Sequence, residues 1–199
     1  MSRPTSAGLP RCPWAGSGPG ADPLMTDYHD EEWGVAVDDD VAIFERLALE
    51  SFQAGLSWST ILRKRPAFRA AFRGFDPAAV AAFDAADRAR LLADPGIVRN
   101  RAKIEATIGN AAAALVVIER FGSLAAYLEG LVPGPPRRLA VDSTAADVPA
   151  TTAASDALAA DLRGRGFRFV GSTIVYAFMQ SVGLVDDHLP GCFRYRGSS

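Results

Sequence analysis

Apolar residues recur at intervals of three and four along most of the chain, which is the spacing of one face of an α-helix. The clearest example follows the acidic run 38–40, where Ile43, Phe44 and Leu47 predict a helix that runs to about Ala54. The same spacing, with capping residues before it and Gly or Pro after it, predicts further helices over 59–72 (with a kink or break at Pro66), 77–83, 87–92, 101–121, 123–131, 152–163 and 170–182.

No segment alternates apolar and polar residues convincingly, as a half-buried strand does. Residues 116–118 and 167–170 favour extended backbone, but both lie within or beside helical patterns. The pattern therefore predicts an all-α fold of about eight short helices. Residues 1–10 contain two prolines and a glycine and are expected to form a flexible tail, so the predicted single all-α domain covers 11–196.

Composition is that of an ordinary globular protein with a buried core. Of the 199 residues, 49% are apolar and 22% are charged. No apolar run approaches the length of a membrane helix, and the N-terminus lacks the apolar region of a secretory signal. We therefore expect a cytoplasmic protein with no membrane contact and with reduced cysteines. The net charge of −2 argues against a surface that is basic all over, but it leaves room for a local basic face.

The two cysteines and two histidines fall into one pair near each end of the chain. Cys12 and His29 are separated by 16 residues, and His188 and Cys192 by three, with a Pro-Gly turn between them. Four nitrogen and sulfur ligands suit zinc in a tetrahedral site. The spacing is not that of a zinc finger, and two buried cysteines with two hydrogen-bonded histidines are the alternative. The scarcity of these residue types favours a zinc ion that joins the two ends, and four protein ligands would make it structural.

Glu50 and a group of aromatic residues are the candidates for a binding site. Glu50 falls at the border of an apolar helix face, where the pattern alone favours a solvated rim residue over a buried functional acid. The aromatic residues cluster in the first third of the chain; core packing would explain them, but a zinc site would draw them into one wall. An aromatic wall with one carboxylate suits a flat, cationic ligand. The aromatic residues are Trp14, Tyr28, Trp33 and Trp58.

Basic residues form three short clusters, at 63–65, 99–103 and 163–168. A solvated helix face explains any one of them. The middle cluster follows the turn Asp94-Pro95-Gly96 and enters a predicted helix. Backbone N–H groups at a helix N-terminus, with Arg and Lys beside them, can bind a phosphate, so this cluster is a candidate phosphate site.

Several of these segments together resemble the DNA-3-methyladenine glycosylase I family. The resemblance covers about residues 11–193, and the motifs occur in the order of the family. It implies an all-α fold of the helix-hairpin-helix glycosylase superfamily, with a structural zinc that joins the N- and C-terminal segments through Cys12, His29, His188 and Cys192. The motifs are 28–35, 53–58, 108–110, 155–158, 166–171, 176–180 and 187–192.

The resemblance also implies roles for the other candidates. Glu50 matches the glutamate that contacts the base, Tyr28 and Trp58 match the stacking aromatics, and Trp14 and Trp33 match the aromatics that close the pocket. Residues 91–111 match the helix-hairpin-helix. The implied DNA-contacting residues are Leu56, which fills the gap left by the flipped base, and Gly96, Arg99 and Lys103 at the hairpin.

The function implied is excision of 3-methyladenine from alkylated double-stranded DNA in base excision repair, by a monomeric, monofunctional glycosylase. Two departures bear on it: Met25 stands where many members have tyrosine, and Ala111–Ala114 offers no aspartate like the catalytic one of other helix-hairpin-helix glycosylases. The alternatives are a glycosylase with shifted base specificity, a non-catalytic module that binds damaged DNA, and a zinc hydrolase.

Overall fold

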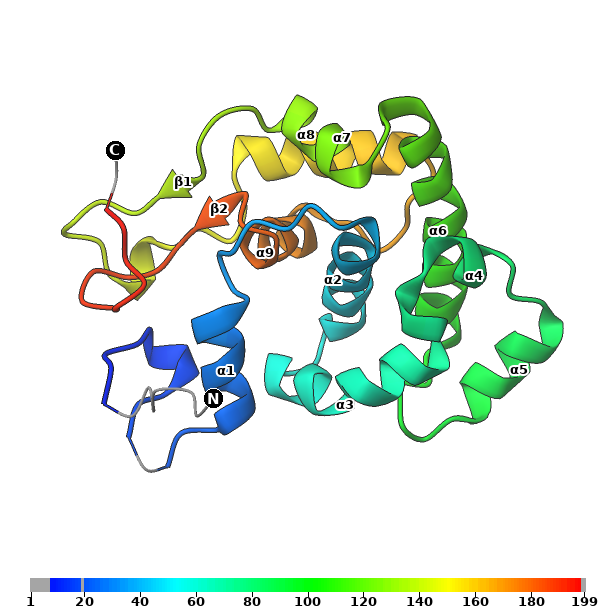
Figure 1. The fold of residues 1–199 in the computed structure, drawn as a ribbon, viewed down its shortest axis with the longest axis horizontal. Coiled ribbons are helices and arrows are strands. Elements are labelled where there is room, and N and C mark those ends of the chain that lie inside the picture. The colour runs from blue at the N-terminus through cyan, green and yellow to red at the C-terminus, as the bar shows by residue number, and fades with distance from the viewer. Residues whose placement is uncertain (1–7, 19, 198–199) are drawn as a thin grey trace, which may run out of the picture.

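Nine α-helices make up most of the part of the chain that this computed structural model describes, residues 8–18 and 20–197 (Figure 1). The helices are α1 (Pro23–Glu31), α2 (Asp40–Gln53), α3 (Trp58–Ala71), α4 (Pro77–Ala81), α5 (Ala85–Ala93), α6 (Arg101–Phe121), α7 (Leu124–Leu131), α8 (Ala153–Gly164) and α9 (Ser172–Ser181). Single 3-10 turns lie at η1 (Pro13–Ala15), η2 (Arg73–Phe75) and η3 (Ala145–Asp147), and β1 (Arg137–Arg138) pairs in parallel with β2 (Val185–Asp186). The predicted all-α fold is confirmed.

Local capping explains where most helices begin. Asp39 accepts a hydrogen bond from Ala42 N at the start of α2, and Asp84 accepts from Ala86 N and Asp87 N at the start of α5. Other N-caps are Ser57, Asp76, Asn100, Ser123 and Thr152. Since these signals are read from neighbouring residues, the predicted helix starts agree closely with those observed. Pro66 was expected to kink or break its helix; it does not break it, because α3 continues through this residue.

The helices pack around α2 and α9, which lie side by side in the middle of the molecule (Figure 1). Helix α8 packs on α9, and α4 packs on α6. The centre of the core is a group of fully buried phenylalanines from α2, α3 and η2, in which the rings of Phe72 and Phe75 are stacked with centroids 5.4 Å apart. Residues near the two termini lie on one side of the molecule, away from α5 and α6 (Figure 1).

The main element that the hydrophobic pattern did not predict is α1. It buries only Tyr28 and His29, so it carries no apolar stripe. Its start could have been recognised, because Asp22 caps the helix and Pro23 occupies its first position. β1 and η3 lie within residues 137–151, where no helix was predicted, and β2 follows the last predicted helix. Residues 1–7 of the expected tail fall outside the described residues.

No single described helix is long and apolar enough to cross a membrane. Helices α6 and α7 meet the criteria of length and composition only when taken together, as a pair bent by 76°.

Gly183 tests how closely the N-terminal segment approaches α9. It has φ 77°, and a Cβ there would lie 2.5 Å from the backbone nitrogen of Ala36. Gly122, with φ 88° and nothing within 4 Å, is a matched control. Gly122→Ala should cost about 1 kcal/mol of stability through its backbone alone. Gly183→Ala should cost clearly more in urea unfolding, because it also clashes with backbone. Equal losses would contradict this packing.

Candidate functional site

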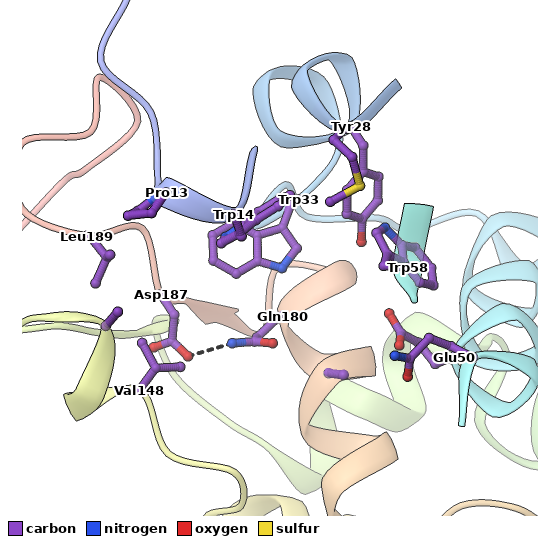
Figure 2. Close-up of a pocket in the computed structure, with 14 residues that line it drawn as sticks. Pro13, Trp14, Tyr28, Trp33, Glu50, Trp58, Val148, Gln180, Asp187 and Leu189 are labelled. Carbon is purple, nitrogen blue, oxygen red and sulfur yellow. Dashed lines mark hydrogen bonds between the residues drawn. The ribbon is translucent and has the colours of Figure 1, made fainter. Parts of the chain in front are cut away.

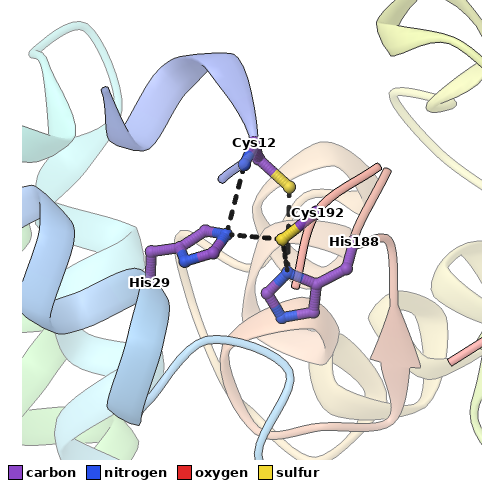
Figure 3. A group of neighbouring side chains, drawn as sticks. All are labelled: Cys12, His29, His188 and Cys192. Carbon is purple, nitrogen blue, oxygen red and sulfur yellow. Dashed lines mark hydrogen bonds between the residues drawn. The ribbon is translucent and has the colours of Figure 1, made fainter. Parts of the chain in front are cut away.

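The four candidate metal ligands come together in one buried cluster (Figure 3). Their ligand atoms all lie within 4.8 Å of one another. Cys192 Sγ is 3.3 Å from His29 Nε2, and His188 Nδ1 is 3.7 Å from the sulfur atoms of both Cys12 and Cys192. Tetrahedral zinc with ordinary bond lengths needs ligand atoms about 3.3–3.8 Å apart. The cluster therefore fits a closed Cys2His2 metal site that joins the two ends of the chain.

Neighbouring groups hold these ligands in the form that a metal needs. His29 Nδ1 lies 2.8 Å from Asp30 Oδ1, and Asp30 is itself paired with Arg11. His188 Nε2 is 3.2 Å from the carbonyl oxygen of Trp33. Each imidazole thus has its second nitrogen engaged outside the cluster, which directs the first toward the other ligands, although His29 Nε2 also accepts a long hydrogen bond of 3.4 Å from Cys12 N.

The sulfur atoms also accept hydrogen bonds from backbone N–H groups. Leu189 N donates to Cys12 Sγ and Arg194 N donates to Cys192 Sγ, and both N–S distances are 3.4 Å. Burial raises the pKa of the Cys12 thiol to about 12. A thiolate in this position therefore needs a cation beside it, and a bound metal would supply that charge.

A cavity of about 500 Å³ lies beside this cluster (Figure 2). Its wall combines η1, α1 and the residues after it, the C-terminal end of α2, the start of α3, η3 and the residue after it, α9 and the segment after β2. All five residues expected to bind the base line it. The lining residues are Pro13, Trp14, Met25, Tyr28, Trp33, Glu50, Gln53, Trp58, Ala145, Val148, Ala177, Gln180, Asp187 and Leu189.

The aromatic residues form a connected wall, as expected. The ring centroids of Trp14 and Trp33 are 5.0 Å apart, and those of Tyr28 and Trp58 are 5.2 Å apart. Trp33 also packs edge-on against His188, with centroids 4.7 Å apart. The wall is therefore in direct contact with the Cys2His2 cluster. Trp58 Nε1 is buried and finds no partner among the described residues, so a donor is left beside the cavity.

Glu50 is buried, with 5% of its surface exposed, and it lines the cavity. The preference for a solvated rim residue, taken from the hydrophobic pattern, was wrong. No described residue donates a hydrogen bond to its carboxyl group. Burial raises the pKa of Glu50 to about 8, and the positive charge of Arg46 opposes this only in part. A largely buried carboxyl group that is unpaired and lines a cavity is available to a ligand.

Three of the four expected DNA-contacting residues lie in two loops. Leu56, on the loop between α2 and α3, is 39% exposed although it is apolar. Gly96 lies in the hairpin between α5 and α6, where a Cβ would come 2.9 Å from Ala67 Cβ, so the hairpin packs closely on α3. Arg99 is exposed and pairs with no described residue.

Lys103 requires a correction. It was expected to contact a phosphate from the start of α6, but it is buried. Its Nζ donates to the carbonyl oxygens of Phe52 and Ala54, at distances of 2.9 Å and 2.7 Å. These carbonyls end α2, so the lysine caps that helix and ties the hairpin to the Leu56 loop. The basic cluster 63–65 is likewise engaged within the molecule; Lys64, for example, donates to the carbonyls of Pro95 and Gly96.

Gln180 and Asp187 are cavity residues that the sequence analysis did not single out. Both lie in segments quoted above only for the resemblance, 176–180 and 187–192. A signal for Asp187 was present, because a carboxylate directly precedes the candidate ligand His188. Met25, the departure noted above, also lines the cavity.

Removal of one ligand should release the connection that the Cys2His2 site makes between the two ends of the chain. Cys192→Ser should lose the bound metal and lower the melting temperature on the order of 10 °C, because a structural site contributes folding energy. Metal content and thermal unfolding, with and without a chelator, measure this. Cys12→Ser should behave alike, and the double variant should be no worse, since either change leaves an incomplete site. Additive losses would show that the cysteines act separately.

Comparison with known proteins agrees with this geometry. The family model for methyladenine glycosylase matches residues 14–195. DNA-3-methyladenine glycosylase 1 of Escherichia coli (strain K12) is 45% identical over 190 residues, which cover 96% of this chain and 99% of that protein. The DNA-3-methyladenine glycosylase of Haemophilus influenzae (strain ATCC 51907 / DSM 11121 / KW20 / Rd) is 42% identical, over 92% of this chain and 96% of that one.

Solved structures give the same result. A crystal structure of 3-methyladenine DNA glycosylase I superposes with a TM-score of 0.86 and 46% identity, over 94% of this chain and 100% of the other. The enzyme of Staphylococcus aureus, described for its recognition of 3-methyladenine, superposes with a TM-score of 0.84 and 38% identity, over 89% and 94% of the two chains. This chain belongs to the methyladenine glycosylase family.

Proposed function

We propose that this protein excises 3-methyladenine from alkylated DNA, as its relatives' names describe, by hydrolysing the N-glycosidic bond in base excision repair. The observation that carries the proposal is Glu50, a buried carboxyl group without a hydrogen-bond partner among the described residues, in a cavity with an aromatic wall. A methylated adenine is flat and, while still attached to the sugar, positively charged. It needs stacking surfaces and an acceptor of hydrogen bonds, and this cavity offers both.

The base would enter the cavity by rotation out of the duplex. This costs a few kcal/mol, which stacking within the enzyme offsets. Tyr28 and Trp58 support that role, because their rings adjoin each other beside Glu50 (Figure 2). The exposed side chain of Leu56 is suited to fill the gap left in the duplex. Arg99, exposed and unpaired with any described residue, is suited to a phosphate at the hairpin.

Glu50 would accept a hydrogen bond from the base and balance its charge. Water then attacks the sugar, and the leaving base needs little further help because it is already cationic. No lysine is placed to attack instead: the chain has two, and the ammonium groups of both Lys64 and Lys103 donate to backbone carbonyls outside the cavity. We therefore infer a monofunctional enzyme that leaves an abasic site and does not cut the strand.

For the metal we propose zinc, held by Cys12, His29, His188 and Cys192. Zinc would supply folding energy and no reaction chemistry, because four protein ligands complete its shell and leave no position for a reacting water. A zinc hydrolase would need such a position, so the ligand set does not support that alternative.

Methylated DNA incubated with the protein tests the activity directly. We expect release of 3-methyladenine and no covalent complex on borohydride treatment. Glu50→Gln should lower kcat/KM about 10- to 100-fold, the value of a charge-assisted hydrogen bond. Glu129→Gln, an exposed change on α7, is the matched control and should have no effect. A protein that binds methylated or abasic DNA but releases no base would be a binding module. Release of another methylated base in place of 3-methyladenine would indicate a shifted specificity.

The ionisation of Glu50 should govern the pH dependence. Since burial raises the pKa of Glu50 to about 8, the carboxyl group of the free enzyme is protonated below this pH. The cationic base prefers the carboxylate, so enzymatic kcat/KM should rise with pH and level off near pH 8. Glu50→Gln should give a flat profile over the same range. Rates are corrected for spontaneous base loss, and an unchanged slope in the variant would assign the titration to another group.

A further inference from the structure

A second set of polar groups lines the cavity across from Glu50. Asp187, which follows β2, has no exposed side-chain surface and accepts three hydrogen bonds. Arg137 Nη1 donates to Oδ1 at a distance of 2.7 Å. The Tyr176 hydroxyl and Gln180 Nε2 both donate to Oδ2, and the distance from Gln180 Nε2 is 2.8 Å. The oxygens of Asp187 are therefore already engaged, so this residue is placed to orient its neighbours and not to meet a ligand.

The neighbour that matters is Gln180, on α9. Asp187 is paired with a guanidinium, so it acts as an acceptor, and the Gln180 side chain must turn its NH2 group toward it. The amide oxygen Oε1 then faces the cavity. Figure 2 shows this arrangement, with the amide nitrogen on the Asp187 side and the oxygen on the Glu50 side. No described residue donates a hydrogen bond to Oε1, so a fixed acceptor is presented to whatever the cavity holds.

We propose that Gln180, held in this orientation by Asp187, is a specificity-determining residue that selects adenine over guanine bases. The proposal rests on the glycosylase function above. The amino group at C6 of adenine has two hydrogens, so one can donate to Oε1 while the other donates to Glu50, whereas guanine carries a carbonyl oxygen there. Two acceptors that face each other within the filled cavity leave both without a partner. Sites built to pair with one donor reject analogues that lack it far more strongly than apolar pockets do.

The experiment measures two bases released from the same DNA. DNA treated with a methylating agent contains both 3-methyladenine and 3-methylguanine, and the ratio of their initial release rates does not depend on how much enzyme is folded. Gln180→Met keeps the length of the side chain and removes the acceptor. Release of 3-methyladenine should fall about 10-fold relative to 3-methylguanine, the cost of one lost hydrogen bond in a buried site.

Two further variants distinguish the orientation of the Gln180 side-chain amide from its mere presence. In Asp187→Asn the new amide donates to Gln180 Oε1, so the Gln180 NH2 group turns to the cavity and the ratio should fall although Gln180 remains. Gln53→Met is the matched control: Gln53 also lines the cavity, but its Nε2 donates to the Leu56 carbonyl oxygen over 2.8 Å at an exposed position. Its ratio should stay at the wild-type value.

The outcomes are distinct. A ratio that falls in Gln180→Met and Asp187→Asn but not in Gln53→Met supports the proposal. It is overturned if Gln180→Met keeps the wild-type ratio, whatever its total activity, or if Gln53→Met lowers the ratio equally. In both of those cases wild-type protein still releases 3-methyladenine and the proposed function stands. Wild-type protein that releases no 3-methyladenine would instead refute the proposed function itself.

Discussion

The joining of the two chain ends at the Cys2His2 cluster is the constraint on which the cavity depends. Three of the four ligands are near neighbours in sequence of a residue in the wall: Trp14 follows Cys12 by two positions, Tyr28 precedes His29, and Leu189 follows His188. Trp33 packs directly against a ligand ring. None of these segments is long enough to have a core of its own, so the wall exists only while the ends are held together.

The cavity combines an aromatic wall with an ionisable carboxyl group, and in the free protein the burial of the wall disfavours the ionisation of that group. Its aromatic surface favours a flat ligand, but the burial that this surface creates disfavours a charged Glu50. A cationic ligand resolves the conflict, because it pairs with the carboxylate in a place where water competes little. A cationic ligand therefore favours the ionised form of Glu50, which burial disfavours in the free protein. The acceptor of Gln180 adds direction to this charge preference.

Features that depend on residues close together in the sequence could be predicted, whereas features that depend on contacts between distant segments could not. Helix boundaries such as those of α6 depend on neighbouring caps and on one apolar stripe, and these were predicted closely. The ligand set and the aromatic group could be proposed because so few residues of these types exist. The burial of Glu50 could not be predicted, because it is created by α1, α3 and α9 closing over the end of α2. Lys103 misled for the same reason, since a basic residue at a helix start gives no sign that it points inward.

Lys103 connects the hairpin between α5 and α6 to the Leu56 loop, the two loops that are suited to DNA. Its single ammonium group, donated by the helix after the hairpin, holds the last carbonyls before the Leu56 loop. The distance between the hairpin and the exposed leucine is therefore set inside the protein, before any nucleic acid is bound. If the proposed roles hold, a duplex bound at the hairpin would meet Leu56 at a set distance along its axis, so the spacing between the phosphate contact and the inserted side chain would be built into the protein.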